Sequence, residues 1–243
     1  MKHIEKEIRY IMTTEMYNNV KKKVQQNWST LEHGYAAKEL TVMYDNPNPS
    51  YSFYSPNVDG RLRLRSLTPW KSDFIDKEFT TTELPYGLFT WKQRLKNSIN
   101  DTARQICREN EIEAKISPTD VDNIAMILEN VLHCPKKSSY ERIRETLYSN
   151  GIEIAFDRFP YGYVCELELK DETTPENMLF ETAEQFGLNN TIISTISCDD
   201  LYKVLCRTAD VEIKTDILFS DNTMPMFDDY YQKLKIKGGR LIV

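Results

Sequence analysis

Charged and apolar residues alternate in several short segments of this chain, and each segment favours one sign of charge. In the segment from Arg61 to Arg65 every second residue is an arginine, and leucines fill the positions between. Near the start of the chain, Glu5 and Glu7 are spaced in the same way. Successive side chains of a β-strand point to opposite faces, so each such segment would have one charged face and one apolar face. The alternation therefore predicts β-strands whose faces carry like charges.

Like charges on one face of a strand lie about 6.5–7 Å apart and repel one another unless a counter-charge lies among them. Further pairs extend the pattern: Lys92 and Arg94, Arg142 and Arg144, and Glu166 and Glu168. An amphipathic strand with its polar face in water would explain any one of these segments, but a solvated face usually mixes both signs. If the strands close into a barrel, the charged faces could point inward and the apolar faces outward, under helices. Such a lumen can hold one elongated ligand.

The rest of the chain supplies strands and a few helices. Apolar spacing and capping residues predict helices over residues 14–27, 118–133, 175–186 and 198–207. Strand-like segments separated by turn signals lie at roughly residues 2–11, 36–45, 50–55, 60–67, 74–80, 88–96, 104–116, 140–147, 151–159 and 162–171. Strands and helices do not alternate as parallel sheets require. The sequence therefore predicts an α+β fold, with an antiparallel β-barrel and helices packed outside it.

The acidic and the basic side chains suit different parts of one ligand. Clustered carboxylates are suitable ligands for a hard cation such as Mg²⁺ or Mn²⁺, which prefers oxygen donors. Rows of arginine and lysine suit phosphate oxygens, and arginine adds bidentate hydrogen bonds. Both together indicate a site for a metal-bound polyphosphate.

Composition excludes several other classes of protein. The 243 residues carry a formal net charge of −6, which does not favour binding to duplex nucleic acid. No apolar run approaches the roughly 18 residues of a membrane helix. The first residues are charged and unlike a secretory signal, so we expect a cytoplasmic protein without membrane attachment. The five cysteines include no CxxC pair, so neither a zinc site nor a disulfide framework is predicted.

The order of the charged segments resembles that of the CYTH, or triphosphate tunnel metalloenzyme, superfamily. Glu5-x-Glu7-x-Arg9 resembles its ExExK signature, with arginine in place of the usual lysine. Later motifs follow in the family's order: Tyr44-Asp45, Gly60 to Arg65, Thr90-Trp91-Lys92, Arg108 with Glu111 and Glu113, Arg142 and Arg144, Asp157, and Gly162 to Glu168. The resemblance spans roughly residues 3–208. We therefore expect a tunnel domain over residues 1–208 and a C-terminal extension, residues 209–243, packed on or near the barrel.

The resemblance implies an eight-stranded tunnel and assigns roles to its charged residues. The catalytic carboxylates would be Glu5, Glu7, Glu166 and Glu168. The same four, with Glu111 and Glu113, would bind one or two Mg²⁺ or Mn²⁺ ions, although the sequence leaves the register of the Glu111 strand open. The phosphate chain would lie along Arg9, Arg61, Arg63, Arg65, Lys92, Arg94, Arg142, Arg144 and Lys170.

The activity implied by the resemblance is metal-dependent hydrolysis of a small-molecule triphosphate: inorganic tripolyphosphate, a nucleoside triphosphate or thiamine triphosphate. Three alternatives use the same lumen. A class IV adenylate cyclase would make cyclic AMP from ATP, an RNA 5′-triphosphatase would act on RNA ends, and a binding module would hold a polyphosphate or nucleotide without reaction. The motifs do not separate the substrates, because each presents the same phosphate chain. A monomer and a homodimer are both compatible with the sequence.

Overall fold

The computed structural model describes residues 3–74, 84–95, 106–171, 173–188, 191–234, 236–237 and 240–241. Its long strands are β1 (His3–Met12), β2 (Glu32–Tyr44), β3 (Gly60–Pro69), β4 (Tyr86–Arg94), β5 (Cys107–Ile116), β6 (Lys136–Ser149), β7 (Ile152–Phe159) and β8 (Gly162–Leu169). The short strands are β9 (Ile192–Ser194), β10 (Asp216–Ile217), β11 (Ile236–Lys237) and β12 (Arg240–Leu241). The helices are α1 (Thr14–Gln26), α2 (Pro118–Met126), α3 (Asn177–Phe186), α4 (Cys198–Ala209) and α5 (Phe227–Tyr230). Short 3-10 turns lie at Trp28–Thr30 and Tyr231–Lys233, and a π-type turn at Ile127–Val131 follows α2.

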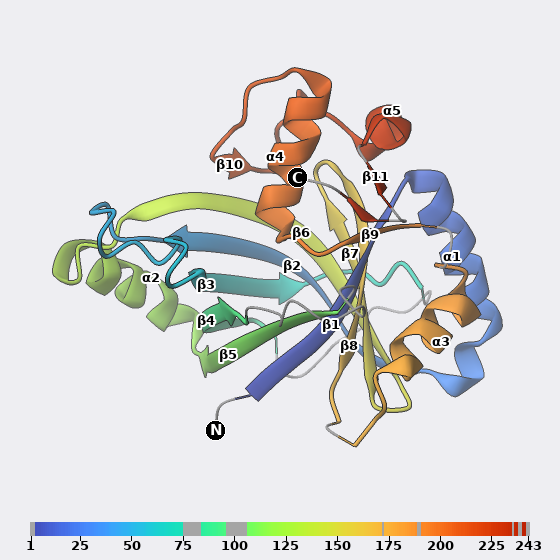
Figure 1. The fold of residues 1–243 in the computed structure, drawn as a ribbon. Helices are drawn as coiled ribbons and strands as arrows, with labels where there is room; N and C mark the ends of the chain where they lie inside the picture. Colours follow the sequence, from blue (N-terminus) through green and yellow to red (C-terminus); the bar gives the residue numbers. More distant parts are fainter. Residues whose placement is uncertain are drawn as a thin grey trace.

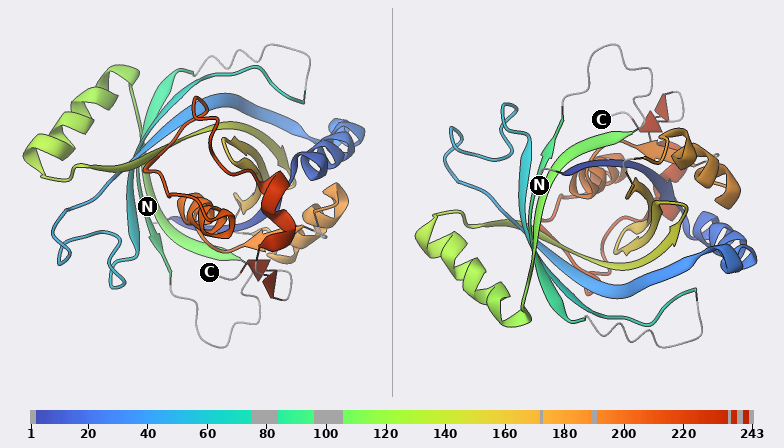
Figure 2. Two further views of the ribbon diagram at one scale, coloured as in Figure 1. Left: turned by 90° about the horizontal axis from the view of Figure 1, so that it is seen from above. Right: turned by 90° about the horizontal axis from the view of Figure 1, so that it is seen from below.

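The eight long strands form a closed barrel of antiparallel pairs in the order β1-β5-β4-β3-β2-β6-β7-β8, and β8 pairs again with β1 (Figure 1). Seen from above or below, the strands form a ring (Figure 2). The closing pair makes Arg9 and Glu166 register partners, although they are 157 positions apart in the sequence. The predicted α+β fold with an eight-stranded antiparallel barrel and helices outside is confirmed.

The apolar faces of the strands point outward, and α1 and α3 cover them on one side of the barrel (Figure 1). Thr13 caps the start of helix α1, and its Oγ1 accepts a hydrogen bond from Met16 N at 3.3 Å. The contact cluster joins Ile8, Tyr10, Phe156 and Leu167 of the strands to Tyr17, Val20 and Val24 of α1 and Leu179, Ala183 and Phe186 of α3. Because apolar burial stabilises the outside of the wall, the inside is left for the charged residues.

Helix α4 lies over one end of the barrel rather than along its wall (Figure 2). Ser197 caps it by accepting a hydrogen bond from Asp200 N at 3.4 Å. Its apolar stripe, including the fully buried Leu201 and Leu205, packs against the ends of β7 and β8 and the turn between them. The first residues of α4 consequently face the inside of the barrel.

Much of the segment after α4 packs against the barrel. Strand β10 pairs in parallel with β6. The ring of Phe227 meets that of Tyr161 edge-on, with 5.5 Å between centroids. The Tyr231 hydroxyl donates to the Ile11 carbonyl at 3.1 Å. These contacts anchor the described part of residues 209–243 on β1, β6 and the β7–β8 turn.

The strand predicted over residues 50–55 is wrong, because this segment consists of successive turns. Asp45 accounts for the difference: its carboxylate accepts hydrogen bonds from Phe53 N at 2.8 Å and from Ser52 Oγ at 2.9 Å. A side chain thus takes a backbone donor that a strand would pair with its neighbour. The helices predicted at 14–27, 118–133, 175–186 and 198–207 are confirmed, with regular α-helix in the second ending at Met126. The strand predicted over 74–80 falls, from residue 75 on, outside the described residues.

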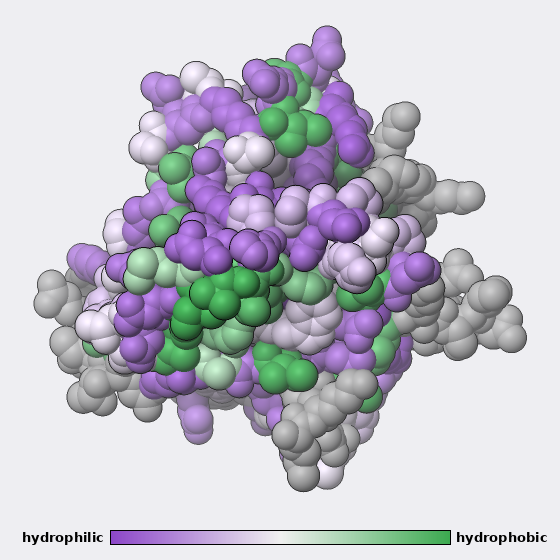
Figure 3. Space-filling view, turned by 90° about the vertical axis from the view of Figure 1, so that its left-hand side faces the viewer, coloured by the Kyte–Doolittle hydropathy of each residue, from purple (hydrophilic) through white to green (hydrophobic). Residues whose placement is uncertain are grey.

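On the face that carries α2, apolar side chains gather among charged ones (Figure 3). The exposed apolar residues of α2 and the turn after it are Met126, Ile127, Val131 and Leu132. Within the described ranges, none of the helices is both long and apolar enough to span a bilayer.

Candidate functional site

The inward faces of the strands and the start of α4 form a charged lumen. The lumen is lined by Glu5, Glu7, Arg9, Arg61, Arg63, Arg65, Lys92, Glu109, Tyr140, Arg142, Arg144, Glu166, Ser197, Cys198 and Asp199. Seven of these residues are arginine or lysine and five are carboxylates. The alternation in the sequence thus places most of the predicted site residues around one space.

Three buried carboxylates form an acidic cluster on one side of this space. Glu5, Glu7 and Glu109 each offer an oxygen within 4.8 Å of the others. The amino group of Lys92 lies 2.6 and 2.8 Å from the two oxygens of Glu5. Burial would raise the pKa of Glu5, but Lys92 outweighs it and holds that pKa below its usual value. Burial also raises the pKa of Glu7 well above its usual value, despite the contact with Arg9.

This cluster fits a hard divalent cation by the chemistry of its donors. Three carboxylates can supply oxygen ligands to Mg²⁺ or Mn²⁺ and leave positions for water and substrate oxygens. Bringing like-charged carboxylates together in a buried space costs free energy that a cation offsets. Lys92 supplies part of that positive charge here, since its amino group contacts Glu5. It also lies 3.2 Å from Glu111.

The three acidic positions of β5 differ in their surroundings. Glu109, which the sequence analysis missed as a ligand, is the one that joins Glu5 and Glu7, because β1 and β5 pair with Glu5 opposite Glu109. Glu111 is half-buried beside Lys92. Glu113 is exposed and accepts a hydrogen bond from Thr90 Oγ1 at 2.9 Å. The signal was present, since the alternation that links Glu113 to Glu111 continues back to Glu109.

In a second group of charges, each of two buried carboxylates contacts two arginines. Glu166 contacts Arg9 Nε at 2.7 Å and also Nη2 of Arg144. These two guanidinium groups hold the pKa of Glu166 well below its usual value, although burial opposes them. Asp157, almost fully buried, lies 2.6 Å from Arg144 and 3.0 Å from Arg142. Glu166 therefore orients arginines of the lumen wall and makes no part of the acidic cluster.

Glu39 has the same role on the opposite side of the arginines, and the sequence analysis missed it. It is fully buried, 2.7 Å from Arg142 Nε and 3.5 Å from Arg65 Nε. Burial would raise the pKa of Glu39, but these arginines lower it to about 2. Asp157 belongs to the quoted motifs, whereas Glu39 stands alone in its segment without alternating charges.

The three arginines of β3 have different partners. Arg65 Nε donates to Thr41 Oγ1 at 3.1 Å, and Arg61 Nη1 lies 3.3 Å from Asp59. Arg63 forms no ion pair with any described residue, and its Nε, although buried, has no hydrogen-bond partner there. Burial opposes its charge, yet nearby Tyr140, Glu109 and Asp199 raise its pKa. A half-buried cation with unused donors, its Nε among them, is the feature expected where an anion binds.

Three further predicted residues lie beyond the lining of the central space. Glu168 is buried, with Lys170 Nζ at 2.8 Å, and burial together with Glu5 raises the pKa of Glu168 to about 8. Lys170 is more exposed and also lies 3.4 Å from Glu153. Arg94 Nε is 3.8 Å from Glu109. The roles predicted for these three residues stay predictions.

Ion pairs line the lumen, and the cavity between them has a volume of about 40 Å³, compared with the roughly 10–15 Å³ of such volume that one water molecule needs. A triphosphate chain would therefore enter only as charged side chains part and exchange their partners.

No family model and no curated protein sequence matches the chain. Among solved structures, it is similar to HpAC1 from Hippeastrum, a candidate adenylyl cyclase described as having a dominant triphosphatase activity. The TM-score is 0.54 at 13% identity, over 84% of this chain and 95% of that one. PH1819 of Pyrococcus horikoshii OT3 gives 0.53 at 19% identity, over 81% and 97%. A chain of the Schizosaccharomyces pombe Mediator head module gives 0.52 at 9% identity, over 79% and 98%.

At these identities the likeness defines the fold. The chain shares its barrel with these solved structures, and the barrel that the motif resemblance implied is confirmed as a fold. The solved structures that share this barrel include a protein with triphosphatase activity.

Proposed function

We propose that this protein is a metal-dependent hydrolase of a triphosphate, which it binds inside the charged lumen. The observation that carries the proposal is the pairing of two unlike groups across one small space. Arg63, a half-buried cation that forms no ion pair with the described residues, lines the same lumen as the acidic cluster of Glu5, Glu7 and Glu109. A metal-bound polyphosphate presents the two complementary charges in one molecule.

The basic residues would bind the phosphate chain and neutralise charge on the phosphoryl group that is transferred. Arg63 needs no partner exchange to accept phosphate oxygens, whereas Arg61 and Arg65 would give up weak contacts of 3.3 Å and 3.5 Å. Stabilising charge and holding the chain in line supply most of the catalysis in phosphoryl transfer. Arg9 and Arg144, which Glu166 orients, would extend the phosphate path.

Glu5, Glu7 and Glu109 would hold Mg²⁺ or Mn²⁺, with Glu111 at the edge of the cluster. Such an ion, when bound, draws charge from phosphate oxygens and makes a bound water more acidic. Lys92 would then leave Glu5 and donate to a phosphate oxygen instead. The metal assignment of Glu166 rests on the family resemblance, since two arginines occupy its oxygens.

The experiment is a substrate panel assayed with Mg²⁺ and with Mn²⁺: tripolyphosphate, thiamine triphosphate, nucleoside triphosphates and 5′-triphosphate RNA. Orthophosphate, pyrophosphate and cyclic AMP are measured together. Orthophosphate supports the proposal. Cyclic AMP with pyrophosphate would identify the cyclase reaction instead.

Replacement of Arg63 tests the lumen itself. Arg63→Gln should lower kcat/KM about 100-fold, the order of effect of removing one donor to a developing oxyanion. Arg207→Gln, on the exposed surface of α4, is the matched control and should leave kcat/KM unchanged. Equal activity of the two variants would refute phosphate binding by the β3 arginines.

A binding module without turnover is the second candidate. The similarity to a chain of the Mediator head module favours this candidate, because one fold can serve several unrelated functions. Thermal stabilisation by tripolyphosphate without release of phosphate under either metal would favour this function.

A further inference from the structure

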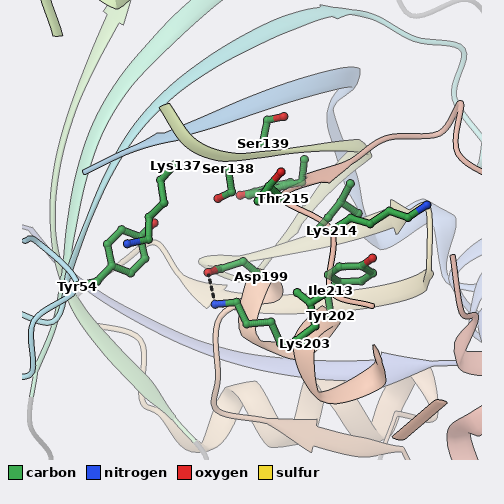
Figure 4. A pocket seen from close by; sticks show the side chains of 12 residues that line it. Tyr54, Lys137, Ser138, Ser139, Asp199, Tyr202, Lys203, Ile213, Lys214 and Thr215 are labelled. Atoms are coloured by element: carbon green, nitrogen blue, oxygen red, sulfur yellow. Dashed lines mark ion pairs between the residues drawn. The ribbon is translucent and has the colours of Figure 1, made fainter. Parts of the chain in front are cut away.

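A second, larger cavity adjoins the lumen at the end covered by α4. It has a volume of about 260 Å³, near the lower end of the roughly 300–1,000 Å³ of small-molecule pockets. Its walls come from the start of β6, the turn segment that carries Tyr54, helix α4 and residues 213–217 (Figure 4). The last of these belongs to the part of the chain that has no counterpart in the family motifs.

Two residues border both spaces. Tyr140 and Asp199 line the lumen and also the second cavity. A further contact crosses the boundary, since the guanidinium of Arg61, a lumen residue, lies 4.7 Å from the ring centroid of Tyr54, which lines the cavity. A molecule whose phosphates reach Arg61 and Arg63 could therefore extend directly into the cavity.

The lining suits a flat ring with polar edges. Tyr202, Ile213 and Ile217 contribute apolar surface to the lining. Ser138 and Ser139 of β6 lie on the other side of the cavity from Tyr202 and Ile213 (Figure 4). Two polar groups at the wall have spare capacity for hydrogen bonds. The Tyr54 hydroxyl is buried and has no hydrogen-bond partner among the described residues. Among the described residues, the ion pair of the Asp199 carboxylate is a long one, with Lys203 Nζ at 3.8 Å.

We propose that this cavity holds the nucleoside of a nucleoside 5′-triphosphate, so that the substrate class is nucleotide rather than inorganic tripolyphosphate. The inference rests on the proposed function, because it uses the lumen as the phosphate site. The base packs between Tyr202 and Ile213, and its polar edge faces Tyr54. The ribose lies at the boundary, where Asp199 accepts hydrogen bonds from its hydroxyl groups. Inorganic tripolyphosphate would leave all of these groups unused.

Filling the cavity tests the proposal without touching the lumen. Ile213→Trp places a large ring at the cavity wall, and Val211→Trp, two residues earlier, is the matched control because Val211 is similarly exposed but does not line the cavity. Four nucleoside triphosphates, thiamine triphosphate and tripolyphosphate are compared for kcat/KM. The dissociation constant of the β,γ-imido analogue of the preferred nucleotide is measured by calorimetry.

We expect the unmodified protein to prefer at least one nucleotide over tripolyphosphate and thiamine triphosphate. Ile213→Trp should lower the ratio of kcat/KM for the nucleotide to kcat/KM for tripolyphosphate at least tenfold. It should also raise the dissociation constant of the imido analogue by a similar factor, whereas Val211→Trp should change neither quantity. An unchanged ratio, or a preference for thiamine triphosphate, overturns the nucleoside assignment while leaving the phosphate site intact. Failure of the unmodified protein to bind or hydrolyse any triphosphate, tripolyphosphate included, would instead refute the proposed function.

Discussion

Glu39 shows how a fully buried acid can be stable in this lumen. Its carboxylate has no access to water, and Arg142 and Arg65 lie 2.7 Å and 3.5 Å away. Burial alone would favour the protonated acid, but the nearby arginines stabilise the carboxylate and lower its pKa to about 2. The pair of arginines in turn would repel each other without it. Glu39 therefore stabilises the folded barrel by holding cations that the proposed function uses.

Glu39→Gln should lower the free energy of unfolding by about 3 kcal/mol at pH 7, as expected when one partner of a buried pair is lost. Because the folded pKa is below the unfolded value of about 4.5, this contribution is complete above pH 4.5 and is lost as the pH falls towards 2. The difference between parent and variant should therefore narrow over that interval. Urea unfolding at a series of pH values measures it.

Glu212→Gln is the control for that series, since Glu212 is exposed. Its unfolding free energy should follow the parent within about 0.5 kcal/mol, as for most surface substitutions. Parallel curves for the parent and Glu39→Gln from pH 7 down to pH 2 would contradict the ion-pair explanation.

Residues with alternating charged neighbours could be placed in the lumen from the sequence, and isolated ones could not. Arg63 and Glu7 were predicted because both have like charges two positions away. Glu39 lies between a lysine and a leucine, a pattern common on any surface strand, so only its cross-strand partner Arg142 reveals its role. Pairing across strands depends on the closed barrel and leaves no local trace.

At the scale of elements, the register of β5 decides which acids can share a cation. The sequence fixes that Glu109, Glu111 and Glu113 point to one side of the strand. It does not fix which of them meets β1. The pairing sets Glu5 opposite Glu109 and His3 opposite Glu111, so the acidic cluster forms two to four residues earlier along β5 than the family motifs suggested.

Two substitutions on this one strand test the register. Glu109→Gln should weaken Mn²⁺ binding at least tenfold, because it removes one of three clustered carboxylates. Glu113→Gln should change it less than twofold, because Glu113 is exposed and contacts Thr90. Calorimetric titration with Mn²⁺ alone, without substrate, gives the comparison directly. The reverse order of effects would restore the motif-based assignment of Glu113.

Helices and hairpin strands followed from local signals, whereas the arrangement around the lumen did not. Thr13 and Ser197 mark helix starts that the sequence shows plainly. The turn segment after Asp45 was predicted as a strand because its aromatic residues favour strands, and the capping role of Asp45 overrides that preference. That α4 and residues 213–217 would build a cavity beside the lumen depends on long-range packing, which no spacing in the sequence encodes.

For the whole molecule, closure of the barrel places opposite charges in one space with little room to spare. Among the described residues, each cation of the lumen lining except Arg63 forms an ion pair with an acid, and the cavity volume is about 40 Å³. Metal alone would have to displace Lys92 from Glu5 and leave it with the longer contact to Glu111 at 3.2 Å. A polyphosphate alone would set its charges beside the carboxylates of the acidic cluster. When both bind, the metal ion separates the phosphate charges from the carboxylates, and the phosphate chain supplies a counter-charge for Lys92.

The two ligands should therefore bind cooperatively. We expect Mn²⁺ to lower the dissociation constant of imidotriphosphate, an analogue that resists hydrolysis, at least tenfold, which is equivalent to about 1.4 kcal/mol of coupling. Imidotriphosphate should lower the dissociation constant of Mn²⁺ by the same factor. Calorimetry in both orders measures the two factors, with the formation of the metal–ligand complex in solution subtracted. Glu7→Gln is the decisive control, because it removes a buried carboxylate of the cluster while keeping the shape of the side chain. In that variant the coupling should fall towards zero although imidotriphosphate still binds the arginines. Full coupling in the variant would mean that the metal acts on the phosphate chain away from the acidic cluster, and the lumen would then be a phosphate site only.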